Sequence, residues 1–259
     1  MDQRVDSASD AVEVVGRDRS GPALILCDHA SNRVPEIVAG GDLGLSAADM
    51  ARHIAYDVGA AGVARRLADL LDAPLVLSRF SRLVIDPNRG EDDPTLVMRL
   101  YDGSIIPANR AVDEAEIERR RALFHRPYHR AITDQIDAML TAKVEPRLVS
   151  IHSFTPQLRG RPPRPWHVGL LWDRDGRLAR PLVQSLAQEP DLCVGDNEPY
   201  SGQLRGDSMY QHGTARGLPH ILIEVRNDLI SGEEGQAAWA ARLARHLAPL
   251  LERGGLGHD

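Results

Sequence analysis

The sequence predicts an α/β fold of three layers, in which a mixed and mostly parallel β-sheet is covered by helices on both faces. Short apolar runs of strand length alternate along the chain with longer segments whose apolar residues recur at helical spacing. Uninterrupted apolar runs are typical of strands buried on both faces. The 259 residues show no internal repeat and suffice for one α/β domain with a large core. We therefore expect a single domain over residues 1–259, of which residues 1–20 form a loose lead-in.

The same patterns place the individual elements. The expected strands are an edge strand at Ala11–Val15 and core strands at Pro22–Cys27, Pro74–Ser78, Leu148–His152, Trp166–Trp172 and His220–Val225. The expected helices are Ser46–Leu71 with Ser46 as its N-cap, Leu178–Gln188 and Ala237–Leu251, and Asp113–Leu140 is expected to form one long helix or two consecutive helices with a kink at Pro127. The remaining segments are a charged, lid-like excursion at Glu91–Asn109 and loops at Arg159–Pro165 and Cys193–Gly213.

Composition excludes several classes of partner. The formal net charge is -6 and aromatic residues make up 4% of the chain, so neither a basic surface nor stacking platforms for nucleic acid are expected. The chain shows no long apolar span and no signal-peptide pattern, so no membrane partner is expected, and a cytoplasmic location fits its two cysteines. Small charged molecules fit this composition better, and nothing in the sequence specifies an oligomeric state.

Three of the apolar runs carry side chains that bind metal ions. The first is followed by Asp28 and His29, the second contains His152, and the third contains Glu224. In open α/β sheets, ligands bind in the crevice outside the carboxyl ends of the strands, so these groups are expected to meet there. Two imidazoles and a carboxylate are the groups that a zinc hydrolase needs. The alternative is that each is a core group with partners inside the protein, such as an ion pair between Glu224 and Arg226.

Several motifs resemble those of known hydrolases. Residues 150–154 (SIHSF) resemble the strand that supplies the last histidine ligand in zinc carboxypeptidases, and residues 223–227 (IEVRN) are similar to their strand with the catalytic glutamate. Residues 28–35 (DHASNRVP), residues 81–89 (SRLVIDPNR) and the long final helix resemble more specifically the N-formylglutamate amidohydrolases. This family is a branch of the same zinc-exopeptidase-like fold. The resemblance covers residues 25–230, most of the chain, and implies a Zn²⁺ cofactor.

The resemblance also implies a set of metal ligands. His29 would be the first zinc ligand and His152 the last, both as neutral imidazoles. The exopeptidase pattern has a glutamate three residues after the first histidine, where this chain has Asn32. A neutral amide binds zinc less well than a carboxylate, so Asp57 and Asp28 are the alternatives to Asn32 as third ligand. Asp57 is otherwise expected on the solvated face of the helix at Ser46–Leu71.

The remaining roles concern the base and the substrate. Glu224, in a desolvated strand, would act as general base and then acid. Asn88 and Arg89 would bind a substrate carboxylate as the similar Asn-Arg pairs do in the resembled hydrolases, with help from Arg82, whose alternative role is an ion pair with Asp86. His212 would reach the substrate carbonyl from its loop, unless it is simply exposed. Neither Ser31 nor Ser153 lies in a nucleophile elbow.

The expected activity is zinc-dependent hydrolysis of the amide bond of N-formyl-L-glutamate or a similar small, acidic N-acyl amino acid. Two alternatives remain open at the level of sequence. One is a hydrolase for another N-acyl amino acid or for a peptide end. The other follows from Asn32 and is a metal-poor, non-catalytic binding protein that keeps the same crevice.

Overall fold

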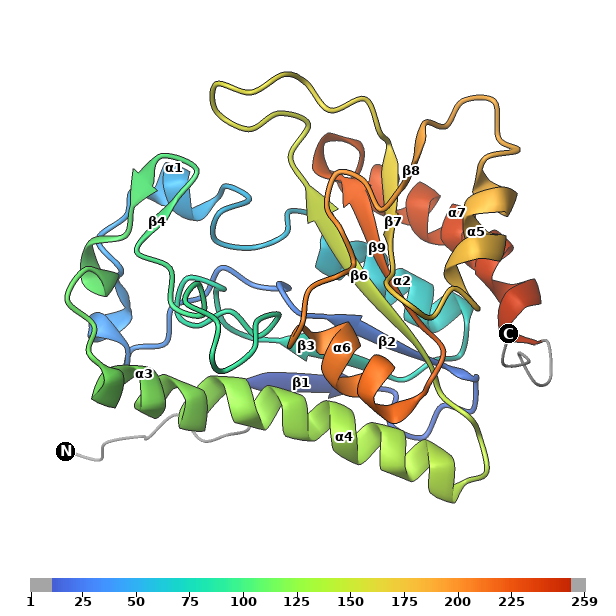
Figure 1. Ribbon diagram of the computed structural model, residues 1–259, viewed down its shortest axis with the longest axis horizontal. Coiled ribbons are helices and arrows are strands. Elements are labelled where there is room, and N and C mark those ends of the chain that lie inside the picture. Colours follow the sequence, from blue (N-terminus) through green and yellow to red (C-terminus); the bar gives the residue numbers. More distant parts are fainter. Residues whose placement is uncertain (1–10, 253–259) are drawn as a thin grey trace.

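A computed structural model describes residues 11–252, and its centre is one seven-stranded sheet (Figure 1). The strands are β1 (Val12–Val15), β2 (Ala23–Cys27), β3 (Leu75–Ser78), β6 (Arg147–Phe154), β7 (Val168–Leu171), β8 (Val194–Asp196) and β9 (His220–Arg226). Their order across the sheet is β1-β3-β2-β6-β9-β7-β8. Strands β3, β2, β6 and β9 are parallel, whereas β1 and β7 pair antiparallel with β3 and β9. The expectation of a mixed, mostly parallel sheet is confirmed.

Helices cover both faces of the sheet. On one face, α2 (Ala60–Leu70), α5 (Ala179–Leu186) and α7 (Glu233–Leu251) pack against alternate strand residues such as Ile25 and Ile221. On the other face, α4 (Arg126–Thr141) and α6 (Ser208–His212) pack against the residues in between, such as Leu24 and Leu222. Figure 1 shows α4 on one side of the strands and α2 and α7 on the other. The predicted three-layer arrangement is therefore confirmed.

Another apolar cluster lies beside the sheet and includes the segment that follows β3. Its centre contains Phe80, Leu83, Val84 and Ile85, which continue the chain directly from β3 and are fully buried. The hairpin of β4 (Leu100–Tyr101) and β5 (Ser104–Ile105) stands in this region, as does α1 (Ala47–Met50). This cluster fixes the loop at residues 86–89, which borders the site described below.

Of the two alternatives expected for Asp113–Leu140, the structure has two consecutive helices. Helix α3 (Glu114–Arg120) is followed by one π-helical turn at Arg121–His125 and then by α4. Pro127 lies in the first turn of α4, where its missing N–H is tolerated. The helix is therefore interrupted in the wider π-helical turn before Pro127 and not at the proline itself.

The prediction of one helix over Ser46–Leu71 is wrong in its middle. Ser46 does cap a helix, because its hydroxyl accepts the Asp49 N–H, but α1 ends at Met50 and α2 begins only at Ala60. Gly59 precedes α2 with φ of 81°, and a Cβ there would lie 2.1 Å from the Ile230 carbonyl oxygen. The break turns Asp57 into the protein, where it is 3% exposed, instead of leaving it on a solvated helix face.

Two further expectations need adjustment. Residues 1–10 of the predicted lead-in lie outside the described residues, and residues 12–15 belong to the sheet as the edge strand β1. The predicted loop at Cys193–Gly213 contains the strand β8 and the helix α6. Between residues 11 and 252, none of the helices is long and apolar enough to cross a membrane.

Candidate active site

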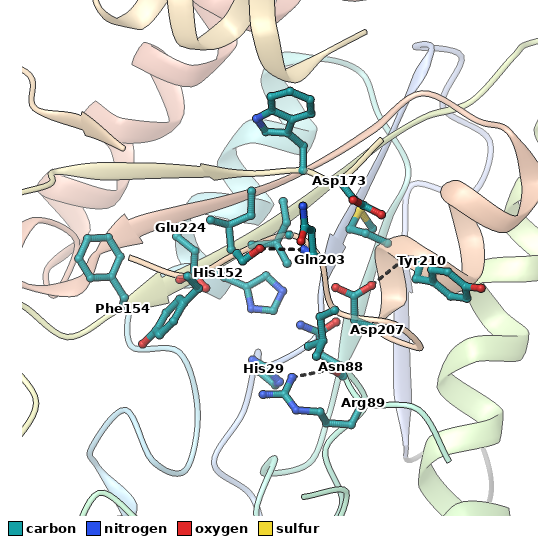
Figure 2. A pocket seen from close by; sticks show the side chains of 18 of the residues that line it. His29, Asn88, Arg89, His152, Phe154, Asp173, Gln203, Asp207, Tyr210 and Glu224 are labelled. Carbon is teal, nitrogen blue, oxygen red and sulfur yellow. Dashed lines mark hydrogen bonds between the residues drawn. The ribbon is translucent and has the colours of Figure 1, made fainter. Parts of the chain in front are cut away.

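The site lies at the carboxyl ends of the central parallel strands. His152 of β6 and Glu224 of β9 are direct partners in the strand register and point to the same face of the sheet. They line a cavity of about 1050 Å³, together with His29 from the end of β2 (Figure 2). Crevices of this kind, at the carboxyl ends of adjacent parallel strands, are where α/β folds bind ligands. The structure thus brings together the three polar groups that the sequence placed after separate apolar runs.

His29, Asp57 and His152 form a compact group that could hold a metal ion. One side-chain atom from each lies within 4.8 Å of the others, and all three residues are buried. The Nδ1 atoms of His29 and His152 lie 3.3 and 2.8 Å from Asp57 Oδ2. Ligands at about 2.0 Å from a tetrahedral zinc ion are separated by roughly 3.3 Å, so this spacing suits one cation between them.

Carboxylates hold the far sides of both imidazole rings. His29 Nε2 donates to Asp86 Oδ1 at 2.7 Å, and His152 Nε2 donates to Asp28 Oδ2 at 2.7 Å. In a neutral ring this leaves the lone pair on Nδ1, and in both histidines Nδ1 lies next to Asp57 Oδ2. The pairing of a ligating histidine with a carboxylate on its other nitrogen is the usual arrangement at metal sites, because it fixes the ring and raises its basicity.

The charges around this group also fit a cation. Asp28, Asp57, Asp86 and Glu224 are buried here, and the buried guanidinium that pairs with two of them is that of Arg82. Burial alone would lower the pKa of His152, but its hydrogen bonds to Asp28 and Asp57 raise it well above the ordinary value. The surrounding carboxylates therefore favour positive charge at the point where the Nδ1 atoms meet Asp57. A divalent metal ion would satisfy this demand.

Asn32 does not belong to the group. Its side chain is on an exposed residue and donates from Nδ2 to the Met50 carbonyl oxygen at 2.9 Å. The break between α1 and α2 brings Asp57 to the position that the sequence pattern reserved for Asn32. The prediction of Asn32 as a ligand is thus contradicted by its position, and the alternative Asp57 lies in the right place. Asp28, the other alternative, holds His152 from behind.

Glu224 is a buried carboxylate with an unsatisfied oxygen. The residue is 7% exposed, and its Oε2 has no hydrogen-bond partner among residues 11–252. Burial raises the pKa of this carboxyl to about 7, and the positive charge at His152 opposes the rise. The alternative of an ion pair with Arg226 is wrong, because Arg226 binds Asp228. A buried acid with a free oxygen, beside a candidate metal site, is the arrangement expected of a general base.

Arg82, Asn88 and Arg89 also line the cavity. Arg82 is held by Asp86 Oδ2, at 3.2 Å from Nε and 2.8 Å from Nη2, so its fork is largely engaged within the protein. Asn88 Oδ1 accepts the Ser208 N–H, and Arg89 Nη1 donates to the Asn88 carbonyl oxygen. Figure 2 shows Asn88 and Arg89 on the side of the cavity next to His29. Both are placed where a carboxylate-bearing ligand can meet them.

His212 lies behind the cavity wall. It is 5% exposed, and its Nε2 donates to His129 Nδ1 at 2.8 Å, while His129 Nε2 donates to the Pro87 carbonyl oxygen at 2.9 Å. The expectation that His212 reaches a substrate from a loop is therefore not met, because α6 turns the ring toward α4. The hydrogen-bonded histidines His212 and His129 instead hold the carbonyl group of Pro87, the residue before Asn88.

The buried position of His212 predicts acid sensitivity. Burial lowers the pKa of His212 to about 4, below the ordinary value near 6.5. The unfolded chain then binds more protons between these values, so the free energy of unfolding falls as pH falls through that window. From pH 7 to pH 5 we expect a loss of about 2 kcal/mol from this group. Measured by urea unfolding, the free energy of unfolding of His212→Asn should depend less on pH than that of the unchanged protein. An equal dependence on pH in the two proteins would contradict this prediction.

The sequence did not indicate that Asp86 holds His29 or that Asp207 lines the cavity. Asp86 follows an apolar run and precedes Asn88 by two residues, and this position predicts a partner for Arg82 but not a carboxylate that orients His29. Asp207 lines the cavity from the start of α6 and lies in a polar segment without periodicity. No pattern in that segment distinguishes it from its neighbours.

Comparisons with known proteins support the same assignment of the fold. The gene product Atu2144 from Agrobacterium tumefaciens has 36% identity over 95% of this chain and 97% of that chain, with a TM-score of 0.88. An N-formylglutamate amidohydrolase from Ralstonia eutropha JMP134 has 24% identity over 93% of this chain and 96% of that chain, with a TM-score of 0.64. Among curated protein sequences, none matches this chain.

The family model of N-formylglutamate amidohydrolase matches residues 21–231. This range contains His29, Asp57, Asn88, His152 and Glu224, and it ends just before α7. It covers most of the chain and agrees with the resemblance seen in the motifs at residues 28–35 and 81–89. The chain therefore belongs to the N-formylglutamate amidohydrolase family.

Proposed function

We propose that this protein is a metal-dependent amidohydrolase that cleaves the amide bond of a small N-acyl amino acid, with N-formyl-L-glutamate as the substrate that the family implies. The observation that carries the proposal is the unpaired Oε2 of Glu224 beside the buried group of His29, Asp57 and His152. A hydrolase needs a base next to its electrophilic centre, and a mere binding protein does not. We assign Zn²⁺ as the cofactor because two imidazoles and a carboxylate form a typical catalytic zinc set.

Different residues of the chain bind the metal ion, orient its histidine ligands and bind the substrate. His29, Asp57 and His152 would hold the zinc ion, which when bound polarises a carbonyl oxygen and lowers the pKa of water. Asp28 and Asp86 keep both histidine rings oriented through their Nε2 atoms. Asn88 and Arg89 hold the substrate carboxylate and so position its amide bond.

Glu224 moves the protons. As a carboxylate it accepts a proton from the attacking water, and as a carboxylic acid it returns that proton to the nitrogen of the leaving amine. The products are formate, or another carboxylic acid, and the free amino acid. Its position on β9, opposite His152 in the strand register, supports this role.

The direct test measures formate release from N-formyl amino acids by protein prepared without chelator. We expect turnover that disappears after dialysis against a strong chelator and returns when Zn²⁺ is added. A panel of formyl, acetyl and dipeptide substrates separates this activity from the removal of other acyl groups or peptide ends. No hydrolysis of any member after the addition of Zn²⁺ would exclude the enzyme function.

Arg89→Ala should weaken substrate binding more than catalysis. Removing a charge-assisted contact to a carboxylate costs about 1.5–3 kcal/mol, so we expect KM to rise about 10- to 100-fold with a smaller change in kcat. Steady-state kinetics checks this, with Arg130→Ala on the exposed face of α4 as the control. A substrate whose α-carboxylate is replaced by an amide should respond little to Arg89→Ala. An equal rise in KM for both substrates would contradict the proposed role of Arg89 in binding the α-carboxylate.

A further inference from the structure

The loop that carries Asn88 and Arg89 has its backbone carbonyl groups engaged from residue 86 to residue 89. The Asp86 carbonyl oxygen accepts the Arg89 N–H at 3.2 Å. The Asn88 carbonyl oxygen accepts Arg89 Nη1 at 2.8 Å, the bond drawn between these two residues in Figure 2. The carbonyl groups of Pro87 and Arg89 are held by side chains from outside the loop. This hydrogen bonding fixes the backbone of the loop.

Two histidines at the start of α4 supply the bonds from outside. His125 Nε2 donates to the Arg89 carbonyl oxygen at 2.8 Å, and His129 Nε2 donates to the Pro87 carbonyl oxygen at 2.9 Å. Residues four positions apart lie on the same face of a helix, and here the two ring centroids are 4.4 Å apart. The two rings therefore hold the loop on both sides of Asn88.

The environment of the two rings points to this hydrogen bonding as their purpose. His125 is 2% exposed, and burial lowers the pKa of both histidines, so both are neutral at pH 7 and keep the proton on Nε2. His125 Nδ1 is buried and has no hydrogen-bond partner between residues 11 and 252. Such an unsatisfied atom costs stability, so packing alone does not account for a histidine here. His125 also ends the π-helical turn, and such turns are frequent at functional sites.

The fixed loop presents two side-chain donors to the cavity. Asn88 Oδ1 accepts the Ser208 N–H at 3.0 Å, which leaves the Nδ2 amino group for a ligand. In the part of the chain that the structure describes, neither Asn88 Nδ2 nor Arg89 Nη2 has a hydrogen-bond partner. Both residues line the cavity. A guanidinium and an amide on one short loop match the two oxygens of a carboxylate.

We propose that His125 and His129 are positioning residues for the site that binds the α-carboxylate of the substrate. They hold the backbone of residues 87–89, so that the side chains of Asn88 and Arg89 meet that carboxylate in one fixed arrangement. Neither ring is among the described residues that line the cavity, so both act through the loop and do not touch the substrate. The inference rests on the proposed amidohydrolase function and adds residues from α4 to its substrate site.

Two replacements of His125 that differ by one methylene group test its hydrogen bond to Arg89. Glutamine can bring an N–H donor close to the position of the histidine Nε2, whereas asparagine is too short to do so. Zinc-loaded Glu224→Gln, which does not turn over substrate, is titrated by calorimetry with N-formyl-L-glutamate and with its α-amide. In this background we expect His125→Asn to weaken the binding of N-formyl-L-glutamate about three- to tenfold, and His125→Gln to restore it to within about twofold. The affinity for the α-amide should change less than about twofold in either variant.

Three further arms separate positioning from general stability. If His125→Asn folds poorly, His125→Leu removes the same donor, and the Asn and Gln pair at His129 tests the bond to Pro87. With Arg89→Ala in the background, His125→Asn should weaken binding less, because the guanidinium that it positions is gone. His246→Asn is the matched control, since it removes a half-buried histidine that bonds only to residues of α5 and the turn after it, and it should leave both affinities unchanged.

The outcomes decide the inference independently of turnover. Unchanged affinity of folded His125→Asn for N-formyl-L-glutamate would overturn it, and so would an equal loss for the α-amide or a failure of His125→Gln to restore binding. If Glu224→Gln itself did not bind N-formyl-L-glutamate, the carboxylate site would be lost and the inference with it. Hydrolysis by the unchanged protein is measured separately and decides the amidohydrolase function alone.

Discussion

Replacing Glu224 with glutamine is expected to lower kcat for N-formyl amino acid hydrolysis by about 10²- to 10⁴-fold, the usual contribution of a general base. Glutamine has nearly the same shape, but it cannot accept the proton of the attacking water. Because Glu224 is outside the group of His29, Asp57 and His152, the variant should bind zinc as the unchanged protein does. Formate release measured in the steady state, with metal content by mass spectrometry on the same preparation, checks both halves of the prediction.

The control for this substitution is Glu145→Gln. Glu145 is an exposed glutamate just before β6, so its replacement makes the same chemical change far from the cavity. It should leave kcat and metal content unaltered. Normal turnover in Glu224→Gln would remove Glu224 from the mechanism, and loss of zinc together with turnover would reassign it to the metal site.

The sheet was predictable because its strands are continuous apolar runs. The runs ending near Cys27 and Ser78, and those containing His152 and Glu224, all form central strands at nearly the expected positions. In parallel strands, the polar residue at the end of each run must emerge at the same edge. This is why His29, His152 and Glu224 could be brought together without knowledge of the structure.

The third position of the metal group was not predictable in the same way. Small and apolar residues continue at helical spacing from Ser46 to Leu71, so the pattern conceals the break that buries Asp57. The break depends on Gly59 packing against Ile230, a contact between residues far apart in sequence. Asp207 was missed for a related reason, since only the contact of Ser208 with Asn88 places it at the cavity.

The proposal that Asp57 is the third metal ligand makes a prediction with a large effect. Asp57→Asn should weaken zinc binding by more than about 100-fold, because loss of a partner that only supports a ligand already costs 10- to 100-fold. The amide keeps the size of Asp57 but removes the charge that faces both Nδ1 atoms. Competition with a chromophoric chelator measures the zinc affinity of each variant.

Asn32→Ala is the matched comparison, because Asn32 is the ligand that the exopeptidase pattern suggests and the structure places elsewhere. Its amide donates to the Met50 carbonyl oxygen, at the end of α1. The variant should therefore keep zinc affinity within a factor of about two, since surface substitutions change little beyond their own contacts. If Asn32→Ala instead lost zinc while Asp57→Asn kept it, Asn32 and not Asp57 would be the third ligand, as the exopeptidase pattern suggests. If both kept it, the metal would have to bind outside the group of His29, Asp57 and His152.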